Sequence, residues 1–300
     1  MPSSIVFTSD EAKAAIRAWF DRFRARLPVP ADEAVVDTSF GRTHALIAGP
    51  GDAAPLVLLH GALASSAHAL AELGPLLRTR RVYALDIIGQ SVMSEDRRLD
   101  LDGDEYGRWA AEAVTALGVD RYDLYGVSWG GFVARKAVSF APQRVRHLAL
   151  MVPAGWVAGH AWAGFRDVGW PILCYRAFPS EARLQRVTAG LFTTPDPMWT
   201  AYFGDALRSY RVDIRLPPLA TAEDVAPIAC PTLVFGAEED RSFPGRPLMA
   251  RVKALLPQAE TELIEGSKHC PPFTDGFRDR IGARLEQFFG SATSSRSTCS

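Results

Sequence analysis

The sequence predicts an α/β fold in which a mostly parallel central sheet has helices on both faces and carries an inserted helical lid. Six short, continuously apolar runs follow one another from residue 55 onward. Such runs are typical of strands that are buried on both faces of a parallel sheet. The segments between most of them are long enough for crossover helices. One long segment, between Pro153 and Cys230, has no obvious central strand and is rich in aromatic residues.

Residues 1–33 are predicted to form a helical extension before the sheet. A helix is expected to begin at Ser9 or Asp10, since apolar residues then recur every three or four positions up to Leu27, which is the spacing of one helical face. The prolines that follow, of which Pro28 is the first, are expected to end it.

The core of the fold is predicted to comprise residues 34–154 and 221–289. It opens with a hairpin, in which two apolar stretches flank a turn at residues 39–42. The buried strands expected after the hairpin are residues 56–59, 82–85, 122–127, 148–152, 232–235 and 261–264. A last helix is expected over residues 276–289.

Residues 155–220 are predicted to form the lid, which prolines divide into short helices. Its aromatic side chains either surround an apolar pocket for a bulky acyl or aryl group, or pack among themselves and hold the lid in place. These aromatic residues are Trp156, Trp162, Phe165, Trp170, Tyr175, Phe178, Trp199, Tyr202 and Phe203. After the core, the Ser-rich residues 290–300 are predicted to be a disordered tail.

The composition argues against several classes of function. The 33 basic and 34 acidic residues leave a formal charge of −1, which does not favour binding to nucleic acid or to an anionic membrane. No apolar run approaches the ~18 residues that span a bilayer, and the N-terminus has no features of a secretion signal. The four cysteines lack metal-ligand or C-x-x-C spacing and are expected to be free thiols. We therefore expect a cytoplasmic protein that acts on a small molecule.

The strongest motif is the segment 126–131, with the sequence GVSWGG, which contains the pattern G-x-S-x-G. A serine at the tip of a tight strand-to-helix turn points its hydroxyl into a cleft, and side chains two residues to either side would collide there. A strand-like run precedes the motif, and apolar residues at helical spacing follow it. Ser128 is therefore the predicted nucleophile, and the alternative is a structural glycine-rich turn.

These features resemble the α/β-hydrolase superfamily over about residues 35–289. The sequence LLHGAL at residues 58–63 looks like the family's oxyanion loop after the third strand. Residues 83–91 are similar to the family's D-x-x-G-x-G-x-S stretch, although the second glycine is missing. We interpret that second stretch as scaffolding.

The resemblance implies that the backbone N–H groups of Ala62 and Trp129 hold the developing oxyanion. Two such donors in a water-poor site are worth several kcal/mol of the barrier. The alternative is that His60 and Gly61 only shape a turn. In neither case is a catalytic proton transfer assigned to His60.

The predicted base is His269. Among the six histidines it alone follows the last expected strand, in the loop before the final helix, where the resemblance places the family's base. His68 and His160 are expected to be ordinary surface or lid residues.

The predicted acid is Asp240, with Glu239 as the alternative. In the family pattern the acid lies three residues after a glycine and four before a proline. Counting from Gly236 selects Glu239, whereas counting back from Pro244 selects Asp240. The order serine, acid, histidine is the one that this fold uses. Either carboxylate could orient the imidazole and stabilise its cation.

A serine nucleophile favours acyl transfer through an acyl-enzyme and argues against the haloalkane dehalogenase and epoxide hydrolase branches, which resemble this sequence but have aspartate at the elbow. We predict a carboxylesterase for small to medium apolar or aryl esters. The rivals are a C–C bond hydrolase, a lactonase or thioesterase, a perhydrolase and, outside enzymes, a ligand-binding receptor. The sequence contains no phosphate loop or metal-ligand cluster, so no cofactor and no metal are expected.

Overall fold

The computed structural model describes residues 4–211, 213 and 215–291. Eight strands form one sheet in the order β1-β2-β4-β3-β5-β6-β7-β8. Strands β1 (Ala31–Thr38) and β2 (Gly41–Ala48) form the expected hairpin, and β2 pairs antiparallel with β4. All remaining pairs are parallel. The predicted fold class is therefore confirmed.

The parallel strands follow the apolar runs of the sequence. They are β3 (Pro55–Leu59), β4 (Arg81–Leu85), β5 (Tyr122–Val127), β6 (Val145–Met151), β7 (Thr232–Ala237) and β8 (Glu260–Ile264). All six residues of β7 are buried, because helices cover both of its faces and leave no side of the strand in water.

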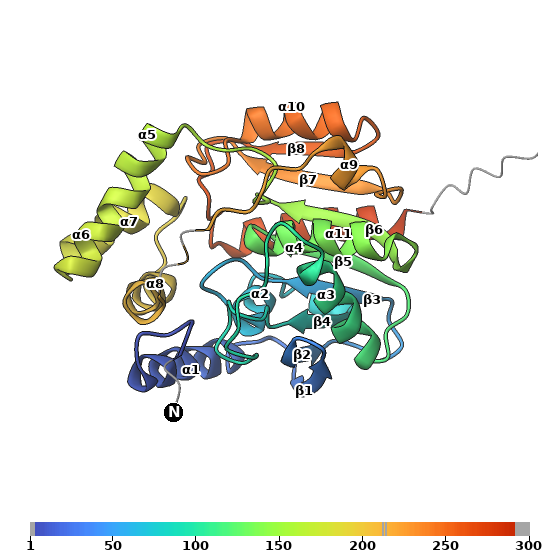
Figure 1. Cartoon of the computed structure of the whole chain (residues 1–300), viewed down its shortest axis with the longest axis horizontal. Helices are drawn as coiled ribbons and strands as arrows, with labels where there is room; N and C mark the ends of the chain where they lie inside the picture. The colour runs from blue at the N-terminus through green and yellow to red at the C-terminus, as the bar shows by residue number, and fades with distance from the viewer. Residues whose placement is uncertain (1–3, 212, 214, 292–300) are drawn as a thin grey trace, which may run out of the picture.

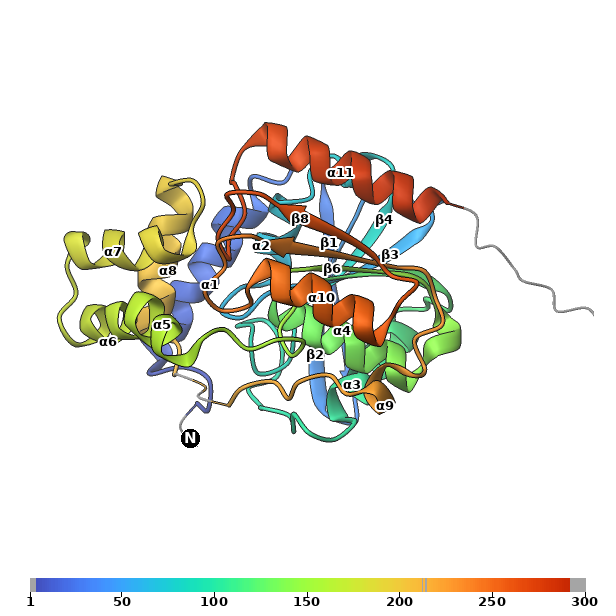
Figure 2. The same ribbon diagram turned by 90° about the horizontal axis from the view of Figure 1, so that it is seen from above.

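Two separate apolar cores form, one on each face of the sheet. Helices α3 (Glu105–Ala116), α4 (Trp129–Phe140) and α10 (Gly245–Leu255) lie on one face, and α11 (Asp275–Gly290) lies on the other (Figure 2). Helix α2 (Ser66–Ala71) contributes to the same core as α11. Two short 3-10 turns, η1 (Leu76–Arg78) and η2 (Pro142–Arg144), lie between elements of the core, and a short helix, α9 (Ala222–Val225), precedes β7.

The insertion between β6 and β7 is helical, as predicted, and projects from one end of the sheet (Figure 1). Its elements are α5 (Ala161–Gly164), the π-helical turn η3 (Phe165–Gly169), α6 (Trp170–Ala177), α7 (Glu181–Leu191) and α8 (Pro197–Ser209). Pro197 begins α8, where its missing N–H has no partner to lose, and Pro171 is the second residue of α6.

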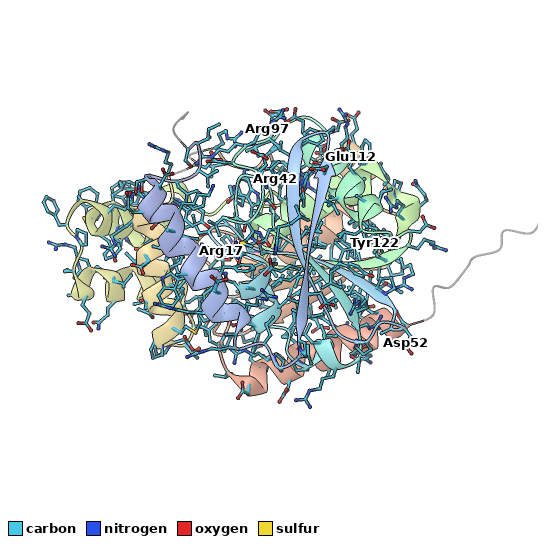
Figure 3. All side chains as sticks on the ribbon, turned by 90° about the horizontal axis from the view of Figure 1, so that it is seen from below. Arg17, Arg42, Asp52, Arg97, Glu112 and Tyr122 are labelled. Carbon is cyan, nitrogen blue, oxygen red and sulfur yellow. The ribbon has the colours of Figure 1, made fainter. Side chains whose placement is uncertain are left out.

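Helix α1 (Asp10–Arg24) lies between the β1–β2 hairpin and the inserted helices (Figure 3). It begins at Asp10, one of the two expected starts, and the Ser9 side chain caps it by accepting from the backbone N–H of Ala12. Leu27, the last residue of the predicted apolar face, lies three residues beyond the end of the helix at Arg24 but still packs against the same core. The indole of Trp19 donates a hydrogen bond of 2.8 Å to Asp205 of α8 and so ties the extension to the insertion.

Helix α11 reaches Gly290, one residue into the predicted tail, and residues 292–300 of that tail lie outside the described residues. Within the described part of the chain, no helix has the length and apolar character needed to cross a bilayer. Three cysteines, Cys174, Cys230 and Cys270, are free thiols, as expected. The fourth, Cys299, lies outside the described residues.

Candidate active site

The sequence 126–131 forms a tight turn between β5 and α4. Ser128 has φ 50° and ψ −111°, a backbone conformation that a residue with a side chain rarely adopts. A Cβ atom on Gly126 would lie 2.4 Å from the carbonyl oxygen of Gly130, and one on Gly130 would lie 2.1 Å from that of Leu59. Both glycines are thus required for the turn to lie this close to its neighbours.

Three of the predicted site residues lie in one hydrogen-bonded row. The hydroxyl oxygen of Ser128 is 3.1 Å from Nε2 of His269, and Nδ1 of His269 is 2.7 Å from Oδ2 of Asp240. The other carboxylate oxygen of Asp240 accepts hydrogen bonds from the backbone N–H groups of Ser242 and Phe243, at 2.7 and 3.0 Å. Both oxygens of the carboxylate therefore have fixed partners.

The electrostatics of the pair favour a charged aspartate. Burial alone would raise the pKa of Asp240, but the attraction of His269 and the hydrogen bonds to the carboxylate outweigh it, so the pKa of Asp240 is lowered. Burial would likewise lower the pKa of His269, but the charge and hydrogen bond of Asp240 raise it above its ordinary value of 6.5. An anionic Asp240 thus makes His269 more basic.

The alternative acid, Glu239, is not brought to the histidine. Its side chain is exposed, and its backbone N–H donates to the carbonyl of Ser267 at 2.7 Å. A turn after β7, in which the N–H of Asp240 donates to the carbonyl of Ala237 at 3.3 Å, takes up the extra residue that made the two spacing rules disagree. Asp240 is only 2% exposed.

The two predicted oxyanion donors come from different elements. Ala62 lines the same cavity as Ser128. Trp129 is the first residue of α4, so its backbone N–H has no acceptor within the helix. Its indole is 7% exposed and packs in the core against Tyr106 and Phe132, which leaves only its backbone for the site.

His60 is a structural residue of the loop after β3. Its Nδ1–H donates to the carbonyl of Gly61 at 2.7 Å, and its Nε2 accepts from the backbone N–H of Ile87 at 2.9 Å. Burial lowers the pKa of His60, so the ring is neutral, and both nitrogens are occupied. That His60 has no part in proton transfer stays a prediction.

The Ser128 and His269 side chains line a cavity of about 290 Å³. The inserted helices contribute Leu191, Phe192, Trp199, Tyr202 and Phe203 to its wall. Of the other aromatic residues in the insertion, Trp156 and Tyr175 are buried away from this cavity. Four more are exposed, namely Trp162, Phe165, Trp170 and Phe178. The insertion thus divides its rings between the cavity, the core and the outer surface.

The expectation that His68 is an ordinary surface or lid residue was wrong. His68 is 1% exposed, and its ring lies against the rings of Phe23 and Tyr202 with centroids 4.0 and 4.1 Å away. Burial lowers its pKa to about 3, so the ring is neutral. Its Nδ1 is 2.6 Å from the hydroxyl of Ser65. His160, by contrast, is exposed.

Sequence reasoning missed several polar and aromatic residues of the cavity, among them Glu72, Phe273 and Arg278. Glu72 follows His68 by four residues at the end of α2, but His68 was expected to be an ordinary residue, so this spacing did not indicate a site. Phe273 and Arg278 carry no comparable pattern. Across residues 4–211, 213 and 215–291, no group of three histidine, cysteine or acidic residues could hold a metal ion.

Comparison of the sequence with known proteins gives one family and two relatives. Residues 56–279 match the alpha/beta hydrolase family. A Bacillus subtilis protein described as an uncharacterized carboxylesterase, nap, is 35% identical over 127 residues, which span 42% of each chain. Carboxylesterase YbfK of the same organism is 25% identical over 281 residues, covering 89% of this chain and 91% of the relative.

Among solved structures, naproxen esterase from Bacillus subtilis superposes with a TM-score of 0.79 at 22% identity. The superposition covers 93% of this chain and 98% of that protein. At this identity the likeness concerns the fold.

Proposed function

Because the chain belongs to the alpha/beta hydrolase family, we propose that it is a serine carboxylesterase for small to medium apolar or aryl esters. The row of contacts from Ser128 through His269 to Asp240, at the wall of a cavity, carries the proposal. The carboxylesterase names of two relatives support it. A cytoplasmic location, predicted from the sequence, belongs to the same proposal.

In the proposed reaction, the Ser128 oxygen attacks the ester carbonyl while its proton passes to Nε2 of His269. Nδ1–H of His269 donates to Asp240, whose negative charge stabilises the imidazolium that forms. His269 then gives its proton to the leaving alcohol, and an acyl group remains on Ser128. Water, deprotonated by the same imidazole, attacks the acyl-enzyme; the imidazolium returns the proton to the Ser128 oxygen as the acyl–oxygen bond breaks, which releases the carboxylic acid and restores the serine.

The negative charge that develops on the carbonyl oxygen requires donors that are in place before the reaction. We assign this role to the backbone N–H groups of Ala62 and Trp129. The fixed ring of His60, bonded on both nitrogens, would hold the loop that carries Ala62. Preorganised donors of this kind stabilise the transition state more than mobile water does.

The insertion, residues 155–220, is proposed to act as the lid and to select the substrate. Its contribution to the cavity is apolar except for the polar tips of Trp199 and Tyr202. A hydroxyl of Tyr202 donates to the carbonyl of Leu63, in the loop beside the serine, and so ties the lid to the site. An uncharged acyl or aryl group fits such a wall better than a charged one.

Two measurements test the proposal. The full chain should react rapidly with a fluorophosphonate probe, with the label on Ser128, and should hydrolyse nitrophenyl esters of small to medium apolar acids. A protein that takes up no label and hydrolyses none of these esters would instead be a ligand-binding member of the family. Labelling at a serine other than Ser128 would contradict the assigned nucleophile.

A further inference from the structure

A second cavity lies next to the active-site cavity. It measures about 630 Å³, against about 290 Å³ for the cavity that contains Ser128. Three residues, Glu72, Trp199 and Arg278, line both cavities. Residues that line two cavities lie between them, so these three separate the active-site cavity from its neighbour. We call them the partition.

The partition is held together by polar contacts. The carboxylate of Glu72 accepts hydrogen bonds from Nε and Nη2 of Arg278 at 3.0 and 3.2 Å, and from the indole N–H of Trp199 at 2.9 Å. The two bonds from Arg278 form a bidentate pair, which fixes the relative orientation of the two side chains. One carboxylate, brought by α2, therefore binds a residue of α8 and a residue of α11.

The indole of Trp199 is the largest part of the partition, and it is fixed on several sides. Its ring stacks on Phe273 with centroids 5.0 Å apart and an interplanar angle of 17°, and its backbone N–H donates to Asp196 at 2.8 Å. On another side it meets the ring of Phe23 at 4.9 Å. A flat ring with these contacts forms a rigid wall.

The two cavities differ in chemistry. Residues that line only the active-site cavity are mostly apolar, such as Leu73, Leu191 and Phe203. Those that line only the second cavity include five charged residues: Arg26, Arg78, Asp196, Asp275 and Asp279. The side chain of Asp275 is 94% exposed, so the second cavity meets solvent. An apolar chain that crossed the partition would exchange an apolar wall for charged groups and water.

We propose that Glu72, Trp199 and Arg278 set the maximum length of one arm of the ester substrate. This inference rests on the proposed ester hydrolysis. The substrates are then esters in which one arm, acyl or alcohol, is short enough to end at the partition. Opening the partition would join the two cavities and let a longer chain extend toward the surface.

The test measures kcat/KM along two series of esters: nitrophenyl esters of acids from acetate to palmitate, and acetate esters of alcohols from methanol to dodecanol. Wild-type protein should show a sharp length limit in one series. Trp199→Ala and Arg278→Ala should move that limit to longer chains and raise the ratio of long-chain to short-chain kcat/KM by about tenfold or more. Trp199→Phe, which retains a ring, should stay close to the wild-type limit.

Met198→Ala is the matched control, since Met198 lines the second cavity but not the active-site cavity, and it should leave both series unchanged. Thermal melting and turnover of the shortest ester show that each variant is folded. Folded Trp199→Ala and Arg278→Ala proteins with wild-type length profiles, or an equal shift in Met198→Ala, would overturn the inference. Wild-type protein that hydrolyses no ester at all would instead overturn the proposed function.

Discussion

Of the three hydrogen-bonded histidine–aspartate pairs among the described residues, two lie at opposite ends of the sheet and differ in what faces the second ring nitrogen; the third joins His44 to Asp86 at 2.7 Å. His269 and Asp240 follow the carboxyl ends of their strands, at 2.7 Å. His147 and Asp123 lie near the amino ends of β6 and β5, at 2.8 Å. Nε2 of His269 faces the Ser128 hydroxyl, which has a proton to give, whereas Nε2 of His147 faces the carbonyl of Ser291 at 3.2 Å.

The surroundings of the two carboxylates differ as well. Asp123 also accepts from Arg80 at 3.0 Å and from Arg146 at 3.1 Å, so it is the centre of an ion-pair network. Asp240 has backbone N–H groups in place of arginines. A buried histidine–aspartate pair is thus not in itself a sign of catalysis. The two pairs are distinguished by the third partner. For His269 it is the hydroxyl of Ser128, which lines a cavity, whereas for His147 it is a backbone carbonyl.

The largest effect is expected from removing the hydroxyl of Ser128, the third partner of the proposed catalytic pair. Ser128→Ala should lower kcat for a nitrophenyl ester by about 10⁴–10⁶-fold, because the site then lacks its nucleophile. The fold should be unaffected, which circular dichroism and thermal melting would show. Considerable esterase activity in folded Ser128→Ala protein, free of wild-type contamination, would contradict the role of Ser128.

The next largest effect should distinguish Asp240 from its neighbour. Asp240→Asn should lower kcat by about 10⁴-fold at neutral pH, since an amide leaves the imidazole in the wrong tautomer. Glu239→Gln is the matched control, because its exposed side chain should make its kcat differ little from wild type. If Glu239→Gln had a strongly reduced kcat and Asp240→Asn a kcat close to wild type, Glu239 would be the acid.

At the other end of the sheet, substitution should affect stability instead of rate. Asp123→Asn removes the charge that pairs with Arg80 and Arg146 and should lower the free energy of unfolding by about 3 kcal/mol or more. The kcat of the folded protein should stay close to wild type. Denaturant unfolding, with active-site titration to count folded molecules, measures both quantities.

The exposed Asp120 provides the control for that experiment. Asp120→Asn should change the free energy of unfolding by no more than about 0.5 kcal/mol. A stable Asp123→Asn protein with strongly reduced kcat would show that the second histidine–aspartate pair also affects catalysis.

The sequence predicted the elbow because its constraints are local. The turn that carries Ser128 needs glycine at positions 126 and 130 within a few residues of the serine, so the pattern is visible in the sequence itself. The choice between Asp240 and Glu239 is of another kind. Spacing rules do not determine which of two adjacent carboxylates a turn directs inward, and here the turn buries Asp240 and exposes Glu239.

The error over His68 and the missed partition have a different physical cause. His68 is buried because Phe23 of α1 and Tyr202 of α8 pack against it, and both are far from it in the sequence. The partition likewise joins α2, α8 and α11 through the contacts of Glu72. Such sites are created by tertiary packing, and no local periodicity in any one segment indicates them.

The smallest effect concerns pH and tests the coupling within the proposed catalytic pair. His269 must be neutral to accept the serine proton, so kcat/KM should fall as the pH drops through the pKa of His269. Because Asp240 raises that pKa above 6.5, the acid limb of wild-type protein should lie above pH 6.5. Asp240→Asn removes the charge that favours the imidazolium, so the limb should move to lower pH. At a pH below the wild-type limb, the variant should therefore retain a larger fraction of its own maximal kcat/KM than wild-type protein does. The ratio of these two fractions should be no more than about tenfold for each pH unit by which the limb moves.

Nuclear magnetic resonance titration of the His269 ring measures the same pKa without relying on the low activity of Asp240→Asn. Glu239→Gln should leave the measured pKa of His269 unchanged, because the Glu239 carboxylate that it removes is exposed and screened by solvent. A wild-type limb at or below pH 6.5 would mean that burial outweighs the attraction of Asp240 at His269. A limb that moves upward in Asp240→Asn would mean that the charge of Asp240 does not raise this pKa.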